Sequence, residues 1–98
     1  MDDRSMMKTP LLAGRRLALI CETSTESYSF GPNGTVAAIL GEKNGPACAP
    51  IFRYRVLSAD SIELLDGDRV FAAWTHIEID GDLLRARCNG QAKVFRIG

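Results

Sequence analysis

Arg69-Val-Phe-Ala-Ala-Trp-Thr-His-Ile-Glu-Ile-Asp80 is the stretch of the sequence that decides the fold. It is the longest uninterrupted run of strand-like composition, and it contains the single Trp and the single His of the chain. A Gly-Asp pair lies on each side of it, Gly67-Asp68 before and Gly81-Asp82 after. Such pairs are typical of tight hairpin loops, so the run predicts a long strand with an antiparallel neighbour on both sides.

The turns also predict which residues lie opposite each other, because the length of a hairpin loop sets the register. Counting from Gly67-Asp68, from Gly81-Asp82 and from the three-residue loop Ser58–Asp60 gives one consistent inward face. The predicted inward side chains are Phe52, Tyr54, Val56, Ile62, Leu64, Phe71, Ala73, Ile77, Ile79, Leu84 and Ala86. The predicted cross-strand pairs are Val56–Ile62, Tyr54–Leu64, Asp66–Arg69, Leu64–Phe71, Ile62–Ala73, Ile79–Leu84, Ile77–Ala86 and Glu78–Arg85.

Two further hairpins complete the pattern. Gly31-Pro-Asn-Gly34 predicts a tight turn, and the pairs expected around it are Phe30–Val36 and Tyr28–Ala38. The hairpin at Asn89-Gly90 allows two registers. A two-residue loop places Phe95 beside Leu84 and Lys93 inward, whereas a three-residue loop places Val94 beside Ala86 and Arg96 inward.

Together these signals predict an all-β fold. We expect an antiparallel up-and-down meander of about eight short strands that closes into a small barrel, with a two-sheet β-sandwich as the alternative. Residues 11–98 should form a single domain after a flexible tail of residues 1–10, with one helical turn over 9–14. The predicted strands are about 16–23, 26–31, 35–42, 51–57, 61–66 and 69–80, followed by one on each side of Asn89-Gly90.

Composition narrows the possible functions. The 98 residues contain 12 Lys+Arg and 12 Asp+Glu, so the formal net charge is zero. Nucleic-acid and anionic-membrane binders usually carry a basic excess, so neither partner is expected. The N-terminus has two early acidic residues and no apolar signal-peptide core, which predicts a cytoplasmic protein if Met1 is the natural start and a secreted or periplasmic one otherwise.

The residues that could carry chemistry are scattered. Cys21, Cys48 and Cys88 lack zinc-type spacing and should be reduced, although a Cys21–Cys88 bridge is geometrically possible if the first and next-to-last strands meet. His76 has no Cys, Asp or second His at metal-binding spacing, and Ser24 and Ser27 have no nearby His or acid that would complete a triad. We therefore predict a non-enzyme with no catalytic residue, no metal site and no cofactor.

Charged side chains fall on the outward faces of the predicted strands. The pairs Arg53/Arg55 and Arg85/Arg87 could each hold a phosphate or carboxylate, but Arg is also common on the solvated face of an antiparallel strand. Glu78 opposite Arg85 predicts a cross-strand ion pair worth less than about 1 kcal/mol.

Trp74 is the most informative single residue. The predicted register turns it outward, where it forms an apolar strip with Leu65, Val70 and Ala72. Three interpretations compete: the N-terminal segment covers the strip, a second subunit or another protein covers it, or a β-bulge turns Trp74 inward. The four residues of the strip are the candidate protein-contact site.

The layout resembles small bacterial lipocalin-like domains of the calycin type. The residues that carry the resemblance are Leu12-Ala-Gly-Arg-Arg-Leu17, Tyr28-Ser-Phe-Gly-Pro-Asn-Gly-Thr35, Trp74-x-x-Ile77, Gly81-Asp-Leu-Leu84, Asn89-Gly90 and Phe95. One difference is that lipocalins begin with Gly-x-Trp, and Arg16 stands in the Trp position here. The resemblance implies binding rather than catalysis and transfers no functional residue.

Three functions follow from these observations. The first is a non-enzymatic interaction module that binds an unknown protein or forms a homodimer through the strip of Leu65, Val70, Ala72 and Trp74. The second is a lipocalin-like binder of a small hydrophobic ligand, and the third is a small barrel-type enzyme inhibitor. An eight-stranded barrel has little internal room, and we expect aromatic side chains to fill most of it. The candidate ligand-lining residues are Tyr28, Phe30, Phe52, Tyr54 and Phe71.

Overall fold

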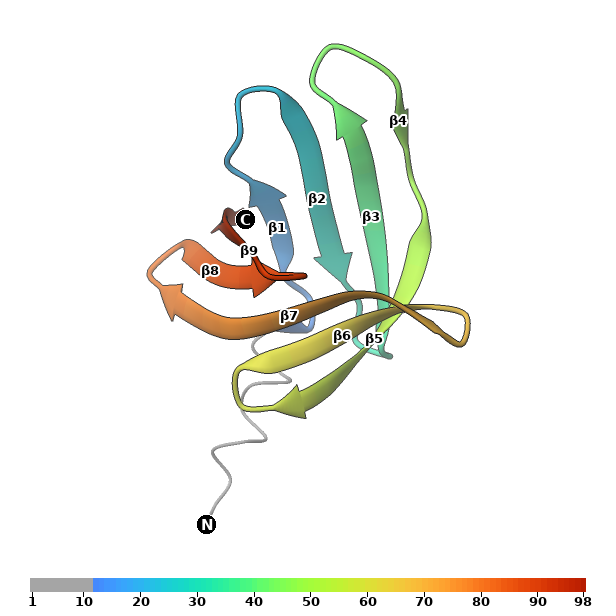
Figure 1. Cartoon of the computed structure of the whole chain (residues 1–98), viewed down its shortest axis with the longest axis vertical. Coiled ribbons are helices and arrows are strands. Elements are labelled where there is room, and N and C mark those ends of the chain that lie inside the picture. The colour runs from blue at the N-terminus through green and yellow to red at the C-terminus, as the bar shows by residue number, and fades with distance from the viewer. Residues whose placement is uncertain (1–11) are drawn as a thin grey trace.

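The computed structural model describes residues 12–98, and Figure 1 shows that they form an all-β structure. The strands are β1 (Arg16–Leu19), β2 (Ser24–Phe30), β3 (Thr35–Glu42), β4 (Ala47–Cys48), β5 (Ile51–Ser58), β6 (Ser61–Asp66), β7 (Arg69–Asp80), β8 (Leu83–Cys88) and β9 (Gln91–Ile97). Of these described residues, none belongs to a helix long and apolar enough to cross a membrane. The tail predicted for residues 1–10 lies outside the described residues.

Eight of the strands close into an antiparallel barrel. The order around the wall is β2-β1-β9-β8-β7-β6-β5-β3, and pairing of β2 with β3 completes the ring. This confirms the predicted barrel and rules out the open two-sheet sandwich. The short β4 is an additional strand that pairs only with the end of β3, through Leu40–Cys48 and Gly41–Ala47. Pro50 separates β4 from β5, because proline lacks the N–H that a continuous strand would use.

Most predicted registers are confirmed. Phe30–Val36, Tyr28–Ala38, Val56–Ile62, Tyr54–Leu64, Asp66–Arg69, Ile79–Leu84 and Glu78–Arg85 are all observed pairs. The last hairpin takes the two-residue loop, so Phe95 lies opposite Leu84 and Lys93 opposite Ala86. Asn89 and Gly90 both have positive φ, 53° and 84°, as a type I′ turn requires. Lys93 therefore points toward the barrel interior.

The predicted register of β7 is wrong in its first half, and the alternative interpretation that a β-bulge turns Trp74 inward is confirmed. Leu65 pairs with Val70 but Leu64 pairs with Ala72, so Phe71 is an extra residue in a β-bulge. The bulge moves Trp74 to a position opposite Ile62, in place of the predicted Ala73. Of the predicted contact strip, Ala72 and Trp74 are therefore buried inside the barrel and do not lie on its surface, whereas Val70 is 50% exposed.

A second irregularity in β7 changes the phase again. The pairing shifts between Thr75–Arg87 and Glu78–Arg85, where His76 adopts a left-handed φ of 55°. The predicted pair Ile77–Ala86 falls within this shift. Ile77 still packs against the core, but Ile79 is 41% exposed, and Phe71 and Ala73 have also left the predicted inward set.

The barrel interior is filled by aromatic and aliphatic side chains, as expected from the sequence. Trp74 is fully buried, stacks on Phe95 with ring centroids 5.1 Å apart, and meets Tyr28 edge-on at the same distance. Phe30 packs edge-on against Tyr54 at 4.9 Å. Leu12, which is 5% exposed, joins this core. The Arg15 N–H donates to the Leu12 carbonyl in a turn. The earlier part of the predicted helical turn lies outside the described residues. The hollow next to Leu12 holds only about 20 Å³.

Candidate functional site

The two ends of the barrel differ because its strands have different lengths. β1 ends at Leu19 and pairs with β2 only from Arg16 to Ala18, whereas β2 and β3 remain paired as far as Ser24 and Glu42. Beyond Leu19 the wall between β2 and β9 therefore has no intervening strand. In Figure 1 this open end lies between the upper halves of β2–β4 and the hairpin of β8 and β9.

Two adjoining hollows occupy this open end, which we call the barrel mouth. One has a volume of about 640 Å³ and lies between the end of β1 and the start of β9. The other, of about 350 Å³, extends over the core toward β3 and β7. Glu26, Gln91 and Lys93 line both hollows, so these three polar residues lie at the centre of the barrel mouth.

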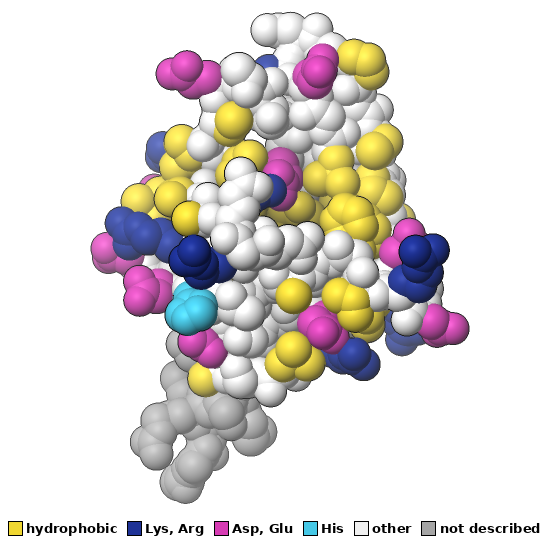
Figure 2. Space-filling model, in the orientation of Figure 1, with side chains coloured by type: hydrophobic (Ala, Val, Ile, Leu, Met, Phe, Trp, Pro, Cys, Tyr) yellow, Lys and Arg dark blue, Asp and Glu magenta, His cyan; other side chains and the backbone are white. Residues whose placement is uncertain are grey.

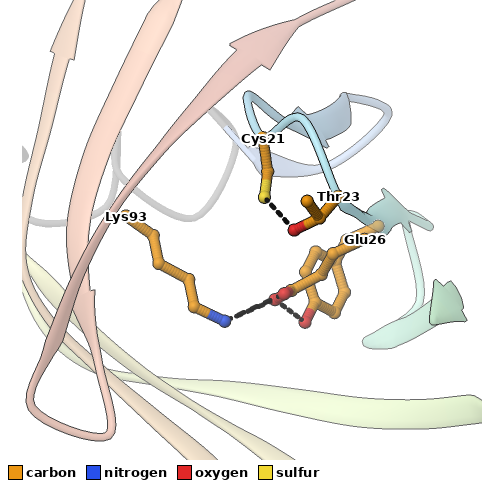
Figure 3. A network of polar contacts seen from close by, with 5 residues as sticks. Cys21, Thr23, Glu26 and Lys93 are labelled. Carbon is orange, nitrogen blue, oxygen red and sulfur yellow. Dashed lines mark hydrogen bonds and ion pairs between the residues drawn. The ribbon is translucent and has the colours of Figure 1, made fainter. Parts of the chain in front are cut away.

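An ion pair spans the barrel mouth. Lys93 Nζ on β9 lies 2.9 Å from Glu26 Oε1 and 3.1 Å from Glu26 Oε2 on β2, and Figure 3 shows the two side chains pointing toward one another. Their side chains are only 22% and 14% exposed, so neither end is fully solvated. Tyr28 Oη donates a third hydrogen bond to Glu26 Oε2 at 2.5 Å. The Glu26 carboxylate is thus held by a cation and a phenol at once.

The tyrosine of this network is kept in its neutral form. Burial raises the pKa of Tyr28 well above its ordinary value, and the hydrogen bond to Glu26 and the negative charge of that carboxylate raise it further. A neutral phenol can donate to the carboxylate, whereas a phenolate would repel it. The network Tyr28–Glu26–Lys93 is consequently a hydrogen-bonded group with a net charge of zero.

On the β3 and β7 side of this polar centre, the wall of the barrel mouth is apolar. Leu40, Phe71, Trp74 and Cys88 line the hollow on the β3 and β7 side. Phe71 is the bulge residue and stacks on Phe52, with ring centroids 4.4 Å apart and an interplanar angle of 21°. Figure 2 shows hydrophobic side chains gathered over the region where Figure 1 draws β3, β4 and the start of β5.

Three free thiols occur in the chain, and two of them line the barrel mouth. Cys21 and Cys88 are not bridged. Hydrogen bonds from the Thr23 and Ser24 backbone lower the pKa of Cys21 to about 7, and its Sγ lies 3.7 Å from Thr23 Oγ1 (Figure 3). Burial raises the pKa of Cys88 to about 11, so this thiol stays protonated at neutral pH.

The structure divides the predicted ligand-lining residues. Tyr28 and Phe71 line the barrel mouth, whereas Phe30, Phe52 and Tyr54 are buried in the core below it. The sequence prediction did not include Glu26 as a partner of Lys93. Glu26 lies two residues before Tyr28 and so shares its inward face. This spacing indicates an ion pair only once Lys93 is also placed inward.

The other chemical candidates lie on the outer surface. His76 is exposed, and its Nδ1 lies 3.2 Å from Thr75 Oγ1. Arg55 pairs with Glu63 at 2.8 Å, and Arg85 lies 3.9 Å from Asp80. Within residues 12–98, no group of three or more His, Cys, Asp or Glu side chains is placed to hold a metal ion.

Comparisons with known proteins add no assignment. No family model, no curated protein and no solved structure matches the chain.

Proposed function

We propose that this domain is a non-enzymatic binding protein that takes a small, uncharged, mainly apolar molecule at the barrel mouth. The observation that carries this proposal is the half-sheltered Glu26–Lys93 ion pair beside the apolar wall that Leu40 and Phe71 contribute to the same hollow. Ligand sites commonly combine apolar walls with a few fixed polar groups that orient the ligand. The resemblance to lipocalin-like barrels favours the same class of function.

The ion pair sets the chemistry of the ligand. Glu26 can accept a hydrogen bond and Lys93 can donate one, so a ligand with an amide, hydroxyl or carbonyl group finds a partner there. Because the pair has no net charge, a charged ligand would gain little from it and would lose its own hydration. We therefore expect neutral ligands to bind more tightly than charged ligands of the same size.

The filled core sets the depth of binding. Trp74, Phe95 and Tyr28 close the barrel below the mouth, so a ligand would lie across Phe71 and Leu40 rather than enter the barrel. The hollows of about 640 and 350 Å³ lie in the range that suits small organic molecules. This geometry favours a shallow site with modest affinity.

The test is a titration with N-phenyl-1-naphthylamine, an uncharged fluorescent probe with one N–H group. We expect saturable binding that Phe71→Ala weakens by about 5–10-fold, the loss of one aromatic contact of about 1 kcal/mol. Val70→Ala is the matched control, because Val70 is similarly exposed, adjoins Phe71 and does not line the hollow. Absence of saturable binding, or equal effects of the two variants, would overturn the proposal.

A further inference from the structure

The outer face of β1, β2, β3 and the start of β5 carries no charge over most of its area. Successive outward positions on these strands are adjacent across the sheet, with Ala18 beside Ser27, Ser27 beside Ile39, Ser29 beside Ala37, and Ala37 beside Ile51. The uncharged positions of this face are Ala18, Ile20, Thr25, Ser27, Ser29, Thr35, Ala37, Ile39 and Ile51. We call these nine residues the neutral face.

The rest of the barrel wall is different. Strands β5 to β9 also carry uncharged outward residues such as Leu57, Leu65 and Val94, but charged side chains are spread among them, namely Arg53, Arg55, Glu63, Arg69, Glu78, Arg85, Arg87 and Arg96. A sheet face exposed to water usually carries such polar and charged residues. Charge is therefore absent from one continuous side of a protein in which 24% of residues are charged.

The neutral face also has a distinct shape. Its isoleucines are strongly exposed, Ile20 at 51%, Ile39 at 47% and Ile51 at 65%. The residues between them have short side chains, such as Ser27, Ser29 and Ala37. Large apolar side chains thus project from a plane of small ones, which leaves room beside each isoleucine for another apolar side chain.

We propose that the neutral face is where two copies of this chain associate, with their sheets packed face to face. A two-fold axis would place the isoleucines of one copy over the small residues of the other. The same surface thus supplies both the projecting isoleucines and the small residues that leave room for them. Because the net charge is zero, no overall repulsion opposes pairing of identical copies. Face-to-face sheets pack about 10 Å apart, a spacing that isoleucine and serine side chains can fill.

The size of the neutral face predicts a weak dimer. At roughly 35 Å² per interface residue, nine central residues and a few at the rim bury about 500 Å² per copy. The total of about 1,000 Å² is at the lower limit for a specific interface, which suggests dissociation in the micromolar range or above. Arg16 and Arg53 border the neutral face, as expected for a charged rim around an apolar centre.

Sedimentation equilibrium of the purified full chain, from about 1 µM to about 1 mM, tests the proposal. We expect the average mass of the wild type to rise from monomer toward dimer across this range. Ile39→Lys and Ile51→Lys should each keep the protein monomeric at concentrations at least about 10-fold higher, because they bury a charge in the interface. Val70→Lys is the matched control, since Val70 has similar exposure on β7 and lies outside the neutral face.

Each outcome is decisive. Both isoleucines are on the surface, so the variants should fold, and the fluorescence of buried Trp74 verifies this independently of mass. A wild type that stays monomeric at the highest concentration would overturn the proposal. A dimer that both isoleucine variants retain, or that Val70→Lys abolishes equally, would place the interface elsewhere and overturn it as well.

Discussion

Replacing Lys93 by Met should reveal how strongly the Glu26–Lys93 pair is coupled inside the barrel mouth. The methionine keeps the length of the side chain but leaves the Glu26 carboxylate, which is only 14% exposed, with Tyr28 as its remaining partner. Leaving a sheltered polar group without its partner costs about 1–3 kcal/mol. We expect the free energy of unfolding to fall by this amount, because both side chains are too sheltered for water to replace the lost contact fully.

A double-mutant cycle separates the pair from its surroundings. Glu26→Gln keeps an oxygen that can accept from Tyr28 but removes the charge, so the double variant Glu26→Gln/Lys93→Met has no unpaired ion. The double variant should be more stable than Lys93→Met alone, and the coupling energy should be about 1–2 kcal/mol. Exposed ion pairs usually give less than about 1 kcal/mol. The cycle therefore distinguishes a sheltered pair from a solvated one.

Urea unfolding monitored by Trp74 fluorescence supplies the four free energies. The m-values should agree across the cycle, so that differences in the midpoint report stability alone. A coupling energy below about 0.5 kcal/mol, within the usual limit of additivity, would refute the reasoning. In that case water would solvate the two charges, and the pair could not orient a ligand as proposed.

Three further predictions concern the cysteines and the β3–β4 pairing. The pKa of Cys88 is raised from 9.0 to about 11, so the unfolded chain loses this proton first as pH rises. In urea unfolding, the free energy of unfolding should therefore fall between pH 9 and pH 11 more steeply in the wild type than in Cys88→Ala. An equal dependence on pH in the two proteins would show that Cys88 is not sheltered. Alkylation of Cys21 by iodoacetamide, followed by peptide mass spectrometry, should have a pH midpoint near its pKa of about 7, and a midpoint above pH 8 would contradict the role given to the backbone donors. Gly41→Ala should destabilise the protein by about 1–3 kcal/mol in urea, because a Cβ there lies 2.6 Å from Ala47 Cα. Gly45→Ala is the control and should cost less, since its Cβ meets the flexible end of a glutamate side chain; equal losses would show that β4 is not tightly held.

The barrel itself could be predicted from the sequence because its turns are explicit. Gly67-Asp68, Gly81-Asp82 and the Pro-Asn-Gly turn each fix a hairpin, and the pairs next to these turns are confirmed. Alternation along the flanking strands then identifies the inward face. Local chemistry was sufficient here, because each hairpin joins residues close in sequence.

The β-bulges of β7 were harder to predict because counting from a turn assumes an unbroken register. The sequence did contain a signal, since the apolar residues Val70, Ala72 and Trp74 have one parity and Ile77 and Ile79 the other. A strand with one buried face cannot keep both sets inward without a change of phase. The structure makes this change at His76, between the inward Trp74 and Ile77, whereas the bulge at Phe71 separates the exposed Val70 from the buried Ala72 and turns Trp74 inward.

The candidate site depended on three-dimensional relations that no local pattern encodes. Glu26 and Lys93 are 67 residues apart in the chain. They meet because β1 is too short to separate β2 from β9 at this end and because the last hairpin takes its two-residue register. From the sequence alone this register is disfavoured, because it turns Lys93 toward the core and the sequence does not identify Glu26 as its partner.

The most direct test of the proposed binding site is a ¹H–¹⁵N NMR titration of the wild-type chain with N-phenyl-1-naphthylamine. The account predicts saturable shifts of the backbone amides of Glu26, Gln91 and Lys93 and of the Trp74 indole N–H, all of which belong to the barrel mouth. Shifts concentrated instead around Val56 and Ile77, at the small hollow beside Leu12, would contradict it, as would a spectrum that does not change.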